Sequence, residues 1–233
     1  MSTLLLRLAA PLQSWGADSK FEERRATMRE PTKSGVIGMI AAALGRRRDE
    51  PIDDLSGLKF GVRIDQPGKL LRDYNTAKSS DGKTSYVTNR YYLSDAVFLV
   101  GLEGDDELLS ALDAAICSPV FPLYLGRRSC PPVGKVSLGV SGKGLMEALR
   151  ETRLQIESKQ QDRRQSSDEN QNTTYVIDTE DVRNPRRRDL PQSFSQRQRK
   201  HSYRHFEESM EPVTRNNALE TEHDAFAAVE EGL

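Results

Sequence analysis

The sequence predicts an α+β fold in which six segments follow one another as strand, helix, strand, strand, helix, strand. Three observations predict it: apolar runs with the two-residue period of strands, two apolar stripes with helical spacing, and turn residues between them. This βαββαβ order is that of ferredoxin-like (RRM-like) domains. We expect the domain to span residues 1–145, with a protruding β-hairpin thumb at about residues 73–93. Residues 146–206 are expected to form a small irregular C-terminal extension, and residues 207–233 an acidic tail.

The first strand and the first helix are marked by the spacing of their apolar residues. In residues 4–8, leucines recur at every second position, as in a strand. The helix follows the string PTKSG at residues 31–35, where Pro31 and Thr32 are start signals, and Gly45 is a stop signal. Its apolar face consists of Val36, Ile37, Ile40 and Leu44.

The remaining elements of the domain follow by the same reasoning. Residues 58–65 are predicted to form an alternating strand, and residues 96–102 a continuously apolar one. Between them lies a polar, tyrosine-containing stretch with an Asp-Gly pair at its middle, which predicts two arms around a turn. Residues 105–116 are expected to form the second helix, with acidic residues at its positive end, and residues 136–140 the last strand.

Charge is distributed unevenly over the last third of the chain. Residues 155–174 are polar and glutamine-rich, which predicts an exposed loop, and residues 174–181 suggest a short strand. Residues 183–204 then carry eight arginines and lysines against one acid, Asp189, whereas eight acids follow from Glu207 onward. The basic segment is suited to an RNA backbone or an acidic partner, and a solvated linker is the alternative. The formal net charge of −1 therefore does not exclude a basic face.

The composition argues against several classes of site. Two cysteines exclude a disulfide scaffold and a four-thiolate zinc site, and all three histidines come after residue 200. We therefore expect no metal and no cofactor. No stretch approaches the roughly 20 apolar residues that span a bilayer, so we expect a cytoplasmic protein without membrane contact.

The first candidate anion site is the string LYLGRRSCPP at residues 123–132. Arg127 and Arg128 present planar donors that match phosphate oxygens, and Gly126 lets a nucleotide approach the backbone. Ser129 follows them directly. Single-stranded RNA held in a fixed shape needs such a combination, and a solvated turn after the second helix is the alternative.

The second candidate is the start of the first helix, at Thr32, Lys33, Ser34 and Gly35. Free N–H groups and the positive end of a helix dipole suit phosphate, whereas ordinary N-capping by Thr32 or Ser34 is the alternative. Lys33 distinguishes the two, because capping does not require it. The connection before this helix carries three further cations, which line the same groove or form a solvated face: Arg24, Arg25 and Arg29.

The predicted hairpin combines tyrosines with cations, which suits insertion between bases or contact with a neighbouring protein. A mobile hairpin with no role in the isolated subunit is the alternative. The side chains concerned are Tyr74, Tyr86, Tyr91, Tyr92, Lys78, Lys83 and Arg90. Trp15, the single tryptophan, is expected in the core or in a subunit contact, with stacking on a base as the alternative.

Several strings of the sequence, in this order, resemble the CasD family: LRLAAPLQSWG, then Arg25 and Thr27, PTKSG, LRDYNTA, YLSDAVF and YLGRRSCP. The resemblance covers roughly the first 140 residues and resumes at LPQSFSQRQRKHSY. It departs from the family at Asn75, where the family often has histidine, and in the acidic tail, which has no counterpart there.

The resemblance implies a non-catalytic, RNA-binding RAMP subunit of Cascade, the type I-E CRISPR surveillance complex. Such a subunit holds the 5′ handle of the CRISPR RNA (crRNA) and contacts the CasC backbone subunit and the large CasA subunit. It meets target DNA only through the assembled complex, and a separate subunit, CasE, cuts the precursor RNA. The RNA-binding residues are then expected to be Arg25, Thr32, Lys33, Ser34, Gly35, Tyr74, Asn75, Arg90, Gly126, Arg127, Arg128 and Ser129.

Two other functions remain open from the sequence. Related subunits of type I-C systems process RNA, so a metal-independent endoribonuclease that processes precursor crRNA is the alternative function. It needs a general acid and base, and the histidines lie far in sequence from the candidate anion sites. A structural adaptor that reads no RNA is the third possibility. The RNA-binding prediction requires residues 126–129 and 33–35 to converge into one cradle.

Overall fold

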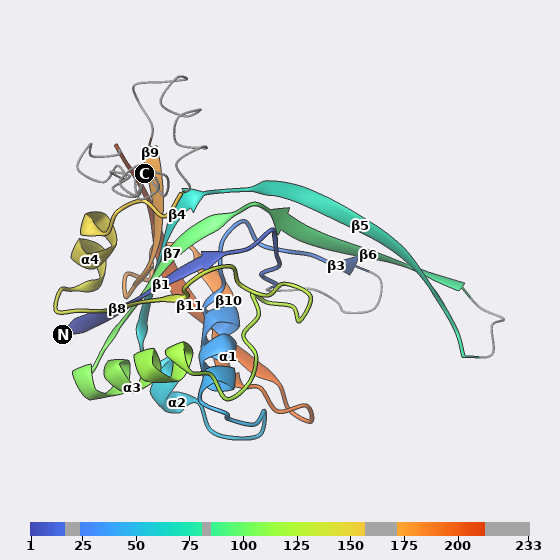
Figure 1. Cartoon of the computed structure of the whole chain (residues 1–233), viewed down its shortest axis with the longest axis horizontal. Coiled ribbons are helices and arrows are strands. Elements are labelled where there is room, and N and C mark those ends of the chain that lie inside the picture. The colour runs from blue at the N-terminus through green and yellow to red at the C-terminus, as the bar shows by residue number, and fades with distance from the viewer. Residues whose placement is uncertain (17–23, 81–84, 157–171, 213–233) are drawn as a thin grey trace, which may run out of the picture.

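An antiparallel sheet forms the body of the protein, and a long two-stranded hairpin projects from it (Figure 1). This computed structural model describes residues 1–16, 24–80, 85–156 and 172–212. Within these ranges the sheet has seven strands in the order β10-β11-β9-β4-β7-β1-β8, and all neighbours are antiparallel. The strands are β1 (Ser2–Ala9), β4 (Lys59–Gln66), β7 (Val97–Gly104), β8 (Ser137–Ser141), β9 (Asn172–Thr179), β10 (Arg186–Ser193) and β11 (Lys200–Pro212).

Helices cover both faces of this sheet. α1 (Lys33–Ala43) and α3 (Asp106–Cys117) pack on one face, in the apolar cluster that contains Leu4. α4 (Leu145–Glu151) packs on the other face, in the cluster that contains Leu5. β1 is therefore buried on both faces, which explains why its sequence is almost continuously apolar.

The two long helices both begin at a side-chain cap, of which Thr32 was a predicted capping candidate. The Thr32 side chain accepts a hydrogen bond from the Gly35 amide at 3.3 Å, and the Asp105 side chain accepts from amides in the first turn of α3. Gly45 follows α1 with a φ of 76°, a left-handed conformation that favours glycine. A short helix, α2 (Asp53–Ser56), then leads into β4.

A long hairpin occupies the region of the predicted thumb and extends beyond it at its base. β5 (Lys69–Lys78) pairs with β6 (Ser85–Ser94) along its whole length, and the Asp-Gly pair of the turn lies outside the described residues. The base of β6 also pairs with β2 (Leu12–Gln13), and its middle pairs in parallel with β3 (Arg24–Arg25). This small sheet joins the hairpin to the N-terminal segment.

The C-terminal third differs from the predicted small irregular extension. β9 pairs with β4, and β11 and β10 continue the same sheet outward, so residues 172–212 belong to the domain that begins at β1. α4 also crosses the predicted domain limit at residue 145. The error has a physical reason: β10 and β11 carry arginines and acids where a buried strand usually has an apolar alternation.

The acidic segment also begins later than predicted. β11 continues to Pro212, and two of its acids form ion pairs, Glu208 with Arg29 and Glu211 with Arg150. Residues 213–233 and most of the predicted polar loop lie outside the described residues. Within the described ranges, no helix has both the length and the apolar character needed to cross a membrane.

Candidate nucleic-acid interface

The arginine loop, defined here as residues 124–130, is closed by its own backbone. The Leu125 amide donates to the Cys130 carbonyl at 2.7 Å, and the Cys130 amide donates to the Arg127 carbonyl at 2.9 Å. Leu125 and Cys130 are buried, and burial raises the pKa of the Cys130 thiol, so it is a neutral anchor. Arg128 and Ser129, between the two anchors, are exposed. The loop is therefore a fixed structure that presents polar groups at its tip.

Gly126 is required in this loop because of a contact within the protein. Its φ is 83°, and a side-chain carbon added to it would overlap the carbonyl group of Ser14. Ser14 and the loop are also hydrogen-bonded, since the Ser14 amide donates to the Leu125 carbonyl at 3.2 Å. The close backbone approach expected for a nucleotide at Gly126 is thus made by the N-terminal segment instead.

Arg127 attaches the arginine loop to the base of the hairpin. Its guanidinium carbon lies 4.6 Å from the centre of the Tyr92 ring, a cation–π distance, and Tyr92 is itself buried in β6. The Ser14 hydroxyl donates to the Tyr91 carbonyl at 3.2 Å, next to the stacked ring. The arginine loop, the N-terminal segment and the hairpin base therefore form one connected unit.

The register of the hairpin decides which of its predicted residues share a face with this unit. Directly opposed residues of an antiparallel pair lie on the same face, and successive residues along a strand lie on opposite faces. Asn75 and Arg90 are therefore on the same face as Tyr92, whereas Tyr74 is on the other. The Arg90 Nε atom is buried and has no hydrogen-bond partner among the described residues, and the Asn75 amide donates to Asp73 at 2.6 Å.

The start of α1 is not the open anion site that the sequence suggested. The Lys33 amide donates to Asp189 at 3.0 Å, and its ammonium group lies 2.9 Å from Asp178. The Lys33 side chain is only 5% exposed. Asp178 belongs to β9, where the sequence suggested a short strand, and Asp189 belongs to β10, which the sequence did not predict. Thr32 caps the helix, and Ser34 is buried. Carboxylates of the protein thus occupy the place expected for a phosphate.

Both predicted segments nevertheless meet the same stretch of chain. Gly126 lies against Ser14, and Gly35 lies against the ring of Trp15, where an added side-chain carbon would be 2.9 Å from the nearest ring atom. Trp15 is fully buried, as expected for a core residue. Gly126 and Gly35 therefore contact two consecutive residues, Ser14 and Trp15. The arginine loop and the start of α1 are connected through this buried segment and do not face each other across an open cradle.

The backbone of Arg25 is placed beside the hairpin by the parallel pairing of β3 with β6, in register with Arg90. Arg29 lies further along the same connection and pairs with Glu30 and Glu208. Arg29 was predicted to line a groove, but it forms ion pairs with other residues of the protein.

Much of the predicted basic segment belongs to the same network. Arg204 donates to Asp189 at 2.7 Å and to Asp178 at 2.6 Å, and Arg187 lies 2.6 Å from the fully buried Glu30. Burial lowers the pKa of Arg204, but its bonds to the two aspartates outweigh this effect and the net shift is upward. These cations hold the C-terminal strands to the start of α1. The sequence feature that could have indicated these ion pairs is the presence of single acids, such as Asp178 and Asp189, in the same polar segments as the arginines that bind them.

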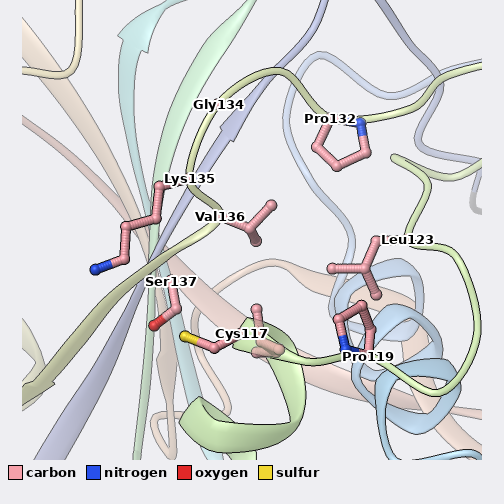
Figure 2. Close-up of a pocket in the computed structure, with 9 residues that line it drawn as sticks. Cys117, Pro119, Leu123, Pro132, Gly134, Lys135, Val136 and Ser137 are labelled. Carbon is pink, nitrogen blue, oxygen red and sulfur yellow. The ribbon is translucent and has the colours of Figure 1, made fainter.

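An open pocket of about 550 Å³ lies beyond the arginine loop, between the end of α3 and the start of β8. Figure 2 shows Pro119, Leu123 and Pro132 on one side of it, and Lys135 and Ser137 on the other. None of residues 126–129 lines this pocket, so it is separate from the candidate interface.

Comparison with known proteins is consistent with this geometry. Residues 3–207 match the family model described as CRISPR-associated protein (Cas_Cas5). The chain is 37% identical over 159 residues to the CRISPR system Cascade subunit CasD of Escherichia coli (strain K12), which covers 59% of this chain and 70% of that relative.

Two solved structures share the fold over nearly the whole chain. One, described as a crystal structure of a Cas protein, is 39% identical, with a TM-score of 0.72, and the match covers 91% of this chain and 95% of that one. The other, described as a CRISPR RNA-guided surveillance complex, contains a chain that is 29% identical, with a TM-score of 0.75 and 98% coverage of both. Because the family model spans most of the sequence and the fold agrees throughout, the chain belongs to the family of CRISPR-associated proteins described as Cas_Cas5.

Proposed function

We propose that the protein is a non-catalytic, crRNA-binding subunit of a type I-E CRISPR Cascade complex, and that it holds the 5′ handle of the crRNA. The observation that carries the proposal is the arginine loop, fixed to the hairpin base by Arg127 and Tyr92, with Arg128 and Ser129 exposed at its tip. The relatives support it, since one is named as a Cascade subunit and another belongs to an RNA-guided surveillance complex.

The RNA contacts are proposed at the arginine loop and on the hairpin face that carries Tyr92. Guanidinium groups match phosphate oxygens in a planar, two-pronged geometry, and the amide of Asn75 suits a base edge. The buried Arg90 Nε atom on this face would find an acceptor in a bound phosphate. Arg25, whose backbone lies beside Arg90, and Tyr74, on the opposite face of the hairpin, complete the proposed RNA-binding set.

The start of α1 takes a different role in this proposal. Thr32, Lys33, Ser34 and Gly35 form the foundation on which the N-terminal segment rests, because their polar groups bond within the protein and Gly35 lies against Trp15. They are proposed to support the arginine loop through the buried segment of Ser14 and Trp15, without touching RNA.

The proposed partners are the CasC backbone subunit and the large CasA subunit, and target DNA is met only through the assembled complex. The hairpin supports a protein contact, since it projects from the sheet with several exposed apolar side chains (Figure 1). These are Leu70, Leu71, Tyr74, Tyr86 and Val87. Exposed apolar clusters of this kind mark interaction surfaces. The cytoplasmic location and the absence of a cofactor stay predictions.

We also propose that β1, α1, β4, β7, α3 and β8 form a ferredoxin-like unit. The strand order β4-β7-β1-β8, read from the opposite edge as the fourth, first, third and second strands of the unit, supports it. α1 and α3 pack on the same face of these strands, which is the arrangement that a βαββαβ chain produces.

An endoribonuclease that processes precursor crRNA is the alternative function. His201 and His205 lie on β11, where the His205 ring is 2.9 Å from the Asn184 carbonyl and the His201 ring packs on Phe194. Incubation of the purified protein with repeat RNA in EDTA tests it: clean cutting at one site would overturn the non-catalytic proposal.

The RNA-binding proposal is tested by a salt titration of RNA affinity for the native protein and for Arg127→Ala. We expect log K against log salt to flatten by about 0.7 per lost phosphate contact on single-stranded RNA. Arg183→Ala is the matched control, because Arg183 is exposed and paired with Asp181 away from the loop. The RNA is the one that copurifies with the tagged complex, compared with a scrambled version. An unchanged slope for Arg127→Ala, or equal binding of the scrambled RNA, would contradict the proposal.

A further inference from the structure

We propose that Asp73 is a base-reading residue of the RNA interface, whose carboxylate accepts two N–H groups of a guanine in the bound strand. The inference rests on the proposed function, since it concerns the same RNA and the same face of the hairpin. It adds a source of base specificity to a surface whose other proposed contacts are mainly with phosphates.

Asp73 lies within the proposed interface, one step outward from the stacked pair of Arg127 and Tyr92. Arg90 is two residues from Tyr92 along β6 and is therefore on the same face, and Asp73 of β5 is directly opposed to Arg90. Asn75 follows two residues further along β5, and the side chains of Asp73, Asn75 and Arg90 are all partly exposed. A carboxylate is thus placed among the groups that are proposed to contact RNA.

Asp73 and Arg90 do not neutralise each other, although their positions in the hairpin are directly opposed. Opposite charges at such positions usually attract and stabilise the pairing of the strands. Here the two side chains form no ion pair, and the Arg90 Nε atom is buried without a hydrogen-bond partner among the described residues. Each group therefore keeps its capacity for a ligand, the guanidinium for a phosphate and the carboxylate for hydrogen-bond donors.

The Asp73 carboxylate is oriented by a single neighbour. The Asn75 side-chain amide donates to its Oδ2 atom at 2.6 Å, and no other group in the described part of the chain donates to this carboxylate. An ionised carboxylate has about four acceptor positions on its two oxygens, so this bond leaves Oδ1 and a second position on Oδ2 open. Asn75 thus acts as a positioning residue, and Asp73 presents two acceptors side by side.

Two adjacent acceptors select one of the four RNA bases. In single-stranded RNA the bases are unstacked and are recognised at their Watson–Crick edges. Guanine presents N1–H and N2–H donors next to each other at this edge. Cytosine and adenine have an acceptor beside their amine, and the N–H of uracil lies between two carbonyl groups. A carboxylate at this place therefore favours guanine, and the neighbouring charge of Arg90 disfavours a cationic side chain of a partner protein as its ligand.

The test compares RNAs that differ in one functional group. The RNA that copurifies with the tagged complex is resynthesised with each guanine in turn replaced by inosine, which lacks the N2 amine. For the native full-length protein, we expect one of these replacements to lower the affinity about 10-fold or more, as for the loss of a hydrogen bond to a charged group.

The same RNAs are then measured with Asp73→Asn, which keeps the shape of the side chain but removes its charge and one acceptor. Its affinity for the original RNA should fall by a similar factor, and the sensitive inosine RNA should bind within about twofold of the original, because the two changes remove one interaction. Asp181→Asn is the matched control, since it removes an exposed carboxylate that is paired with Arg183, outside the hairpin. It should match the native protein.

The direction of the effect separates base reading from mere proximity to RNA. A carboxylate that only lies near the strand repels its phosphates, so its removal would raise the affinity. Unchanged or higher affinity of Asp73→Asn would therefore overturn the inference. If Asp73→Asn binds more weakly but the native protein tolerates inosine at every guanine, Asp73 only orients Asn75, and the inference is also overturned.

Other outcomes separate this inference from the function on which it rests. If Arg127→Ala weakens RNA binding and Asp73→Asn does not, the guanine contact is refuted and the proposed function stands. If the native protein does not prefer the copurifying RNA over a scrambled one, both fail. If Asp73→Asn binds RNA normally but recovers less of the partner subunits, Asp73 pairs with a cation of a neighbouring protein, and the inference is overturned.

Discussion

Gly126 shows how a single residue determines the geometry of the arginine loop. Its positive φ is accessible to glycine at little cost, and the position of its missing side chain is taken by the Ser14 carbonyl. We expect Gly126→Ala to lower the free energy of unfolding by at least about 2 kcal/mol, because it adds left-handed strain to a backbone clash. Urea denaturation measures the loss. Gly142→Ala is the control, since its added carbon would meet nothing within 4 Å; equal stability of the two variants would contradict the close contact.

At this scale, the polar character of a loop can be predicted from the sequence more easily than the residues that its side chains contact. The Gly-Arg-Arg-Ser string predicts a polar loop correctly because its signal is local. It could not identify Tyr92 or Ser14 as the groups that hold the loop, since they lie about 35 and 112 residues away along the chain. Lys33 is the clearest case. Its residue type suits a phosphate, but its ammonium group is neutralised by Asp178. The sequence suggested a strand at Asp178 but not its place in the sheet beside β4.

At the scale of elements, Asp189 connects three of them. This fully buried carboxylate in β10 accepts hydrogen bonds from Arg204 in β11 and from the Lys33 amide at the start of α1. Asp189→Ala leaves Nε and Nη2 of the buried Arg204 and the Lys33 amide without their acceptor, so we expect a loss of about 3–5 kcal/mol, measured by denaturant unfolding. Asp181→Ala removes a carboxylate from an exposed pair with Arg183 and should cost less than about 1 kcal/mol. Similar losses for both variants would mean that Asp189 does not anchor the strands.

A second connection between elements depends on pH. Glu211 of β11 binds Arg150 of α4, and this hydrogen bond holds the pKa of Glu211 below its ordinary value. A lowered folded-state pKa gives stability that is present above the unfolded-state pKa and is lost as pH falls through the folded value. Glu211→Gln should therefore have a lower melting temperature than the native protein at pH 7, and the difference should shrink below about pH 4. A difference that stays constant over this range would show that the charge of Glu211 makes no contribution.

The elements that sequence patterns predict well are those in which one force dominates. β1, β4, β7, α1 and α3 bury apolar side chains, and their periodicity is visible directly. β10 and β11 instead bury Asp189 and Arg204 against each other, and Pro191 is tolerated because β10 lies at the edge of the sheet. Their stability comes from pairing between distant charges, which has no periodic signature, so the sequence alone suggests a basic linker.

At the scale of the whole molecule, the net charge of −1 does not show that the cations fall into two groups with different roles. One group, including Lys33, Arg187 and Arg204, is buried in ion pairs that hold the C-terminal strands to α1. Another group, including Arg48 and Arg128, is exposed and unpaired within the described residues. Only the second group can neutralise phosphates at small cost, since the first would have to give up a buried partner. The RNA-binding surface therefore depends on which cations the fold leaves exposed and unpaired, and the amino-acid composition does not show which ones these are.

The hairpin offers a test of whether binding and folding reside in different parts of the molecule. It projects from the seven-stranded sheet, and both main apolar clusters lie largely outside it (Figure 1). Asp73 and Arg90 are directly opposed, so an Asn-Gly turn in place of residues 74–89 keeps the base of the hairpin intact. We expect the shortened protein to melt within about 4 °C of the native one, which corresponds to roughly 1 kcal/mol for a domain of this size.

The same shortened protein should lose function while it stays folded. It lacks Tyr74, Asn75 and Tyr86, so its affinity for the copurifying RNA should fall, and a tagged form should recover less of the partner subunits. Replacing only residues 79–84 by Asn-Gly is the matched control, because Lys78 and Ser85 are also directly opposed and both strands keep their full length. Full RNA binding and full partner recovery by the shortened protein would remove the hairpin from the interface. Unfolding of the shortened protein would show instead that the hairpin stabilises the sheet. If the hairpin does not stabilise the sheet, removing it leaves the two apolar clusters, and therefore the fold, in place.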